Sequence, residues 1–144
     1  MANTATINTT YTNEAGTSVV KSVTLTGDMV NTIEREGIAA GEINVEFDVP
    51  LTVANILAFG MSVKKSKGEG SDKTVGATVK TNSTSTPAET FLLTAENGLS
   101  WSDGDPAVNP LATDLTKLFV TNTGTAKIDF AFRVLIDSTP GVGG

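Results

Sequence analysis

The chain has 144 residues, of which 39% are hydrophobic and 18% are charged, a composition typical of one folded domain with an ordinary core. It contains no cysteine and no histidine, which excludes disulfide and thiolate chemistry and removes the commonest zinc ligand and general base. The net charge of −6 disfavours binding to phosphate backbones and to anionic membranes. Composition therefore favours a structural or binding protein, and we expect no catalytic residues, no metal and no cofactor.

Threonine and glycine dominate the remaining composition, with 23 Thr and 14 Gly residues. Threonine is β-branched and favours strands, whereas glycine favours turns, so this mixture indicates a β-protein with many short connections. The first 30 residues contain no basic segment followed by an apolar one, so we expect no signal peptide. We also expect no transmembrane anchor, because the longest apolar stretch, 49–63, is too short and is interrupted by polar residues.

The first half of the chain contains two predicted strands and two ambiguous segments. Residues 19–26 form the first strand, ending at Gly27-Asp28, and residues 43–49 form a second, in which apolar and polar residues alternate until Pro50. The segments 29–36 and 52–61 fit either a short helix or a strand, because their apolar spacing suits both.

The second half of the chain is richer in strand signals. Residues 75–79 alternate as a half-buried strand, and residues 128–136 alternate over a run long enough to cross a whole sheet. Two hairpins are predicted from turn residues of the Asn and Gly type. One hairpin joins strands 90–94 and 99–102 through 95–98, and the other joins 115–121 to 128–136 through 122–125.

About eight short strands separated by Gly, Asn, Asp and Pro turns predict an all-β fold. We expect two antiparallel sheets face to face, as an antiparallel β-sandwich or jelly roll. The predicted organisation is an extended N-terminal arm at 1–12, one sandwich domain at 13–137 and a C-terminal tail at 138–144.

The charges are distributed unevenly along the chain. Segment 64–80 carries a net charge of +3, whereas segments 28–48 and 89–114 each carry −5. A lysine-rich segment such as 64–73 is commonly a solvated loop, but the same separation of charge lets copies meet through complementary patches. No aromatic residue interleaves with the lysines, so we expect no nucleic-acid binding.

Each sequence motif that suggests chemistry lacks an essential part. The segment 68–74 ends in Lys-Thr like a phosphate-binding loop, but Asp72 occupies the position where that loop needs glycine. Asp103 and Asp105 beside Trp101 suggest a glycosidase pair, yet they are typical of a polar turn that ends at Pro106.

Three further features also have ordinary explanations. The carboxylates Asp103, Asp105 and Asp114 lack the spacing of a calcium loop. The sequons at Asn8 and Asn82 are expected by composition in a chain so rich in Asn and Thr. Trp101, the only tryptophan, is interpreted as a core residue, with anchoring of a partner as the alternative.

Five segments of the C-terminal half form a recognisable pattern, 78–82, 90–93, 97–101, 114–122 and 132–136. In these segments the chain resembles small virion structural proteins of tailed bacteriophages, particularly capsid decoration or cement proteins. The resemblance covers about half of the chain and includes no catalytic signature. It implies a compact sandwich or jelly roll that binds the outside of an icosahedral shell, often as a trimer, and braces the junctions between capsomers.

The same resemblance implies the partners and the location. The partners would be the major capsid protein and copies of the chain itself, as a homotrimer, with no nucleic acid, membrane or small-molecule substrate. The location would be the capsid exterior of the virion, after synthesis in the host cytoplasm, and residues 1–11 would be the arm that lies across a neighbour. The alternatives are a phage tail-tube or fibre component and a carbohydrate-binding sandwich module.

Overall fold

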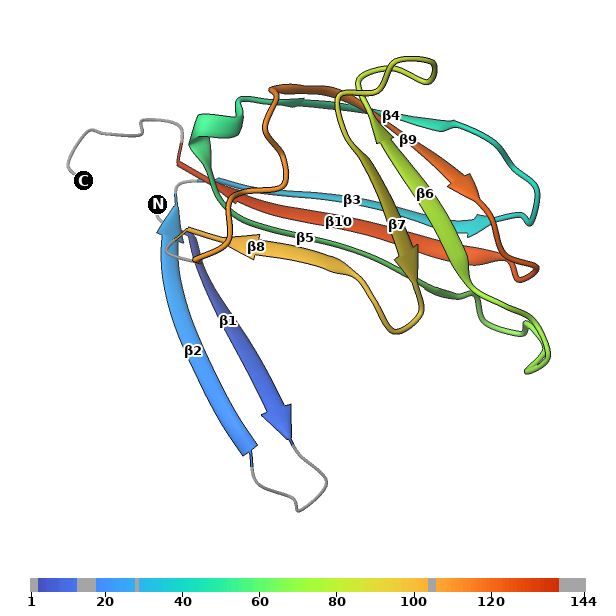
Figure 1. Cartoon of the computed structure of the whole chain (residues 1–144), viewed down its shortest axis with the longest axis horizontal. Helices are drawn as coiled ribbons and strands as arrows, with labels where there is room; N and C mark the ends of the chain where they lie inside the picture. The colour runs from blue at the N-terminus through green and yellow to red at the C-terminus, as the bar shows by residue number, and fades with distance from the viewer. Residues whose placement is uncertain (1–2, 13–17, 28, 104–105, 138–144) are drawn as a thin grey trace.

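The computed structural model describes residues 3–12, 18–27, 29–103 and 106–137 of the chain (Figure 1). Its elements are ten strands and one short 3-10 helix, Val53–Asn55. The strands are β1 (Asn3–Thr12), β2 (Ser18–Gly27), β3 (Met29–Ile38), β4 (Val45–Leu51), β5 (Ile56–Lys65), β6 (Gly76–Thr81), β7 (Thr90–Thr94), β8 (Leu99–Ser102), β9 (Leu115–Asn122) and β10 (Ile128–Ile136). Among the described residues, no helix is both long enough and apolar enough to cross a membrane.

The eight strands from β3 to β10 pair as one long antiparallel hairpin that is rolled up. The first strand pairs with the last, β3 with β10, and the pairing continues inwards through β4 with β9, β5 with β8 and β6 with β7. Two further pairings, β10 with β5 and β9 with β6, complete two four-stranded sheets. We call β3-β10-β5-β8 sheet I and β4-β9-β6-β7 sheet II. This nesting is that of a jelly roll, so the predicted all-β sandwich of about eight strands is confirmed.

The core lies between the two sheets and follows the alternation that the sequence shows. Along β10, Ile128, Phe130, Phe132 and Val134 are at most 2% exposed, and the residues between them lie on the outer face, where they are half-buried or exposed. The ring of Phe130 meets the ring of Phe47 from sheet II at a centroid distance of 5.6 Å. These contacts hold the two layers together and explain why 128–136 carries the clearest strand pattern in the chain.

Both predicted hairpins are wrong, although their strands are correct. β9 lies in sheet II and β10 in sheet I, and β7 and β8 are divided between the sheets in the same way. The turn residues at 122–125 make a crossing between sheets. The Asn122 side chain is buried and donates hydrogen bonds to the carbonyl oxygens of Ile38 (3.0 Å) and Ala126 (2.8 Å). A Cβ at Gly124 would collide with the carbonyl oxygen of Thr74, so the crossing requires glycine there.

The strand predicted at 43–49 is shifted towards the C-terminus. Ile43 is 71% exposed and precedes β4, because Asn44 adopts a left-handed conformation (φ 54°) that interrupts the extended backbone. Pro50 does not end the strand and lies inside β4, where the register shifts between Asp48 and Leu51. A proline fits there because β4 is an edge strand and the irregularity removes the need for its N–H.

The structure decides the two ambiguous segments. Residues 29–36 belong to the edge strand β3, which extends along β10. Residues 52–61 divide into the 3-10 helix and the start of β5, so each reading describes part of the segment.

The N-terminal region is the largest difference from the predicted organisation. β1 pairs with β2 over ten consecutive positions in a two-stranded sheet, which we call the ribbon. The sandwich strands therefore begin at Met29, not at 13, and the arm includes 18–27. Residues 13–17 and the predicted tail at 138–144 lie outside the described residues.

Candidate interaction surfaces

The ribbon leaves the sandwich beside the end of β10 and extends away from both sheets (Figure 1). Its attachment is close, because Gly27 is buried and a Cβ there would collide with the carbonyl oxygen of Ile136 and approach the Leu135 side chain at 3.0 Å. Among the described strands, β1 and β2 pair only with each other. A two-stranded sheet of this kind is marginally stable in water, so it is the part of the fold that gains most from a partner.

The register of the ribbon divides its positions into two unlike faces. Antiparallel neighbours share a face, and positions along each strand alternate between faces. One face carries threonine, serine and asparagine at nearly every position, as in the neighbouring pair Thr6 and Thr24. The opposite face carries every apolar position of the two strands except Val20, together with one charge, at Lys21. The apolar positions on this face are Ala5, Ile7, Tyr11, Val19, Val23 and Leu25.

A second surface lies on the outer face of sheet I, where small residues border a central arginine. Arg133 on β10 pairs with Glu34 on β3 (2.5 Å), and both side chains are more than half exposed. A depression of about 160 Å³ on one side of Arg133 is lined by carboxylates and Lys64, and one of about 370 Å³ on the other side reaches β8. We call these together the outer hollow. Its principal lining residues are Glu34, Glu36, Gly60, Ser62, Lys64, Ser100, Asp129, Ala131 and Arg133.

The outer hollow is charged but partly neutralised within itself. Asp129 accepts hydrogen bonds from the Gly37 backbone N–H (3.0 Å) and the Ser66 hydroxyl (2.5 Å). Three carboxylates and two cations line the hollow, so it carries a small excess of negative charge. The alternation of residues along β10 predicts from the sequence that Arg133 points outwards, but the sequence does not predict the outer hollow around it. Its shape depends on Gly60 and Ser62 of β5, which only the pairing of β5 with β10 places beside Arg133.

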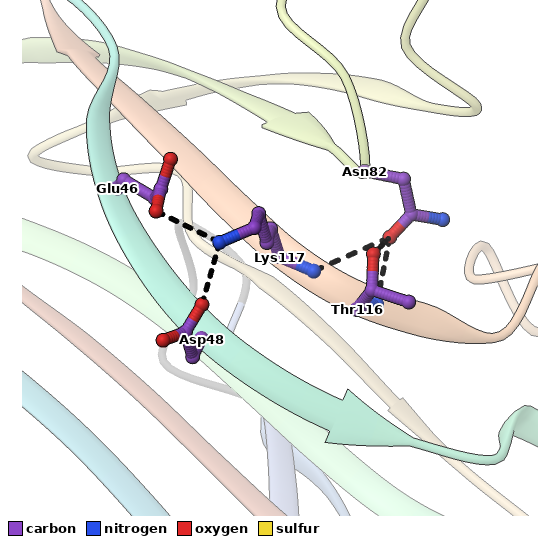
Figure 2. A network of polar contacts seen from close by, with 5 residues as sticks. All are labelled: Glu46, Asp48, Asn82, Thr116 and Lys117. Atoms are coloured by element: carbon purple, nitrogen blue, oxygen red, sulfur yellow. Dashed lines mark hydrogen bonds and ion pairs between the residues drawn. The ribbon is translucent and has the colours of Figure 1, made fainter.

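A third polar feature occupies the outer face of sheet II (Figure 2). Lys117 on β9 lies between Asp48 and Glu46 of β4, with its Nζ 2.7 and 2.8 Å from their carboxylate oxygens. The hydrogen bonds to Asp48 and then to Glu46 raise the pKa of Lys117 from 10.5 to about 12. These groups are exposed and are bonded mainly to one another, so the arrangement fastens the edge strand β4 to β9.

Asn82 occupies the other end of this network. Its backbone is left-handed (φ 67°), and its side-chain oxygen accepts hydrogen bonds from the backbone N–H of Thr116 (2.8 Å) and of Lys117 (3.4 Å). Its amide nitrogen donates to the carbonyl oxygen of Asp114 at 2.9 Å. The sequon asparagine therefore acts as a backbone clamp at the start of β9 (Figure 2). The nitrogen that a glycan would need is engaged by the carbonyl oxygen of Asp114.

The remaining candidate residues do not converge on a site. The lysine-rich segment runs from the end of β5 through the exposed loop before β6. Lys65, the last residue of β5, donates from Nζ to the carbonyl oxygen of Gly70 in this loop at 2.9 Å. Trp101 packs against the core and donates from Nε1 to the carbonyl oxygen of Ala107 (3.0 Å). Asp103 and Asp114 are described, whereas Asp105 lies outside the described residues. In the part of the chain that the structure describes, no group of three carboxylates gathers as a metal site would require.

The searches for related proteins gave no match to a protein-family model, to a curated protein or to a solved structure.

Proposed function

We propose that this chain is a non-enzymatic virion structural protein that binds the outside of an icosahedral phage capsid as a decoration protein and stabilises the junctions between capsomers. Its partners are the major capsid protein and further copies of itself in a homotrimer. The proposal joins the resemblance of the C-terminal half to decoration proteins with the architecture of the chain.

The ribbon is the observation that supports this proposal most directly. A pair of ten-residue strands that extends away from the sandwich, with apolar positions on one face, is suited to contacts between subunits. A subunit of a shell gains affinity from such an exposed element because the same contact is repeated by symmetry. The jelly roll supports the proposal by analogy, because viral capsid domains use this architecture, as lectins also do.

The copy number of the chain in purified particles tests the proposal. Particles from the source cells are separated on a density gradient, and quantitative mass spectrometry compares the chain with the major shell protein. A decoration protein is expected at a copy number comparable to that of the shell subunits. A few copies per particle would contradict decoration and indicate a tail or vertex component, and absence from every particle fraction would contradict a virion role.

Surface labelling of intact particles tests the exterior location separately. The loop between β5 and β6 carries the exposed Lys67 and Lys73 outside the sandwich. These lysines are expected to react with an amine-specific reagent as fully in intact particles as in disrupted ones. Protection in intact particles only would place the chain inside the shell and contradict decoration.

A further inference from the structure

We propose that the ribbon of one copy lies with its apolar face over the outer hollow of a second copy, so that copies of this chain are linked by ribbons. This inference names the partner of the ribbon and rests on the proposed function for the view that the ribbon is an assembly arm. The contact is a property of the chain itself and needs no shell.

The connection between the ribbon and the sandwich directs the ribbon away from its own sheet. β2 ends at Gly27 and β3 begins at Met29, so one residue joins them. Reversing the chain between antiparallel segments takes a loop of two residues or more. The close contact of Gly27 with the end of β10 further fixes the point of departure. The ribbon is therefore placed to reach another copy and not to fold back over its own outer hollow (Figure 1).

The dimensions of the ribbon match the surface of sheet I. Ten residues of extended strand span about 33 Å, and the nine residues of β10 span about 30 Å. The apolar positions of the ribbon lie along most of this length, from Ala5 to Tyr11 on β1. The outer hollow is recessed at its centre because the small residues Gly60, Ser62 and Ala131 surround Arg133.

Charge favours the outer hollow over a second ribbon as the surface that receives the ribbon. Lys21 shares the apolar face and lies in register with Thr9, near the middle of β2. Two ribbons packed through these faces would bring two Lys21 residues into one interface, which is unfavourable. In the outer hollow the same lysine meets an excess of carboxylates, those of Glu34, Glu36 and Asp129.

Cross-linking between two full-length variants tests this arrangement, and the absence of native cysteine makes the labelling specific. One population carries Val23→Cys on the apolar face of the ribbon, and a second, isotopically labelled population carries Ser62→Cys in the outer hollow. The two populations are mixed and cross-linked with a short bis-maleimide, and the masses of the intact products are measured by mass spectrometry. The matched control replaces Val23→Cys by Thr24→Cys, the adjacent position on the opposite face.

The proposal predicts a labelled–unlabelled heterodimer in several-fold higher yield from Val23→Cys than from Thr24→Cys. Equal yields, or no heterodimer, would overturn it, and so would a dominant homodimer of Val23→Cys, which would show ribbon-to-ribbon packing. A chain carrying both Val23→Cys and Ser62→Cys would also overturn it if the link formed within single copies at high dilution. The experiment uses isolated protein, so its outcome is independent of whether the chain is found on capsids.

Discussion

Lys117 is the residue whose environment gives the clearest dependence of stability on pH. Its pKa is raised to about 12 by Asp48 and Glu46, so the folded state holds the proton more tightly than the unfolded state, where the value is 10.5. The stabilisation is therefore complete below pH 10.5 and is lost as the pH rises through about 12.

We expect the difference in urea midpoint between the wild type and Lys117→Met to be constant from neutral pH to pH 10.5 and to shrink between pH 10.5 and about 12. Arg133→Met, which removes a cation of the other sheet, is the control and is expected to show no such change in this window. If the difference in urea midpoint between the wild type and Lys117→Met stayed constant up to about pH 12, the two carboxylates would not stabilise charged Lys117.

Asn82 combines an unusual backbone conformation with a side-chain clamp, and two substitutions separate these roles. Asn82→Gly keeps the left-handed backbone accessible but removes the hydrogen bonds to Thr116 and Asp114, whereas Asn82→Ala loses both properties. We expect Asn82→Gly to lower the free energy of unfolding by about 1–2 kcal/mol and Asn82→Ala to lower it by roughly 1 kcal/mol more. Chemical denaturation measures the unfolding free energy of both variants. An equal loss in the two variants would show that the left-handed backbone of Asn82 makes no separate contribution to stability.

Among the elements, the connection from β9 to β10 depends on one buried amide. Asn122→Ala leaves the carbonyl oxygens of Ile38 and Ala126 without their donor in a buried site, so we expect a loss of about 1–3 kcal/mol in unfolding free energy. The adjacent and exposed Thr123→Ala is the control and is expected to change stability little. Equal effects of the two substitutions on the denaturation midpoint would contradict this role of Asn122.

The strands were readable from the sequence, but their partners were not. Alternation of apolar and polar residues is a local signal, and it identified β6 and β10 because one face of each is buried over most of its length. Pairing is set by long-range contacts, so the turn residues at 95–98 and 122–125 gave the wrong partners. Those residues do make tight connections, as predicted from their chemistry, but the connections pass from one sheet to the other.

The candidate surfaces were predictable only in part for the same reason. The sequence identified an N-terminal arm from its polar composition, but the amphipathic division of the ribbon exists only in the register of β1 with β2. The outer hollow combines residues of four strands that are far apart in the sequence, and Glu34 and Arg133 are separated by 99 positions. No local pattern reports such a combination.

At the scale of the whole molecule, the sandwich is held by the apolar layer between its sheets, and it is expected to unfold as one unit. Phe132 is fully buried in that layer, and Phe132→Ala is predicted to lower the unfolding free energy by about 3–5 kcal/mol. Leu92→Ala removes a side chain that is 77% exposed, so its effect is expected to be within about 0.5 kcal/mol. Far-ultraviolet circular dichroism and tryptophan fluorescence should report the same midpoint for each variant. Separate transitions for the two probes would show that the layers unfold independently.

The nested pairing also determines when the chain can fold. β3 is the first strand of the sandwich and its only neighbour in sheet I is β10, the last strand, which is also the link between β3 and β5. During synthesis, sheet I therefore cannot be completed until β10 has left the ribosome. Contacts of such long sequence separation are associated with folding in milliseconds to seconds. Until then β5 lacks its neighbouring strand β10, and this interval is when the nascent chain is most exposed to aggregation.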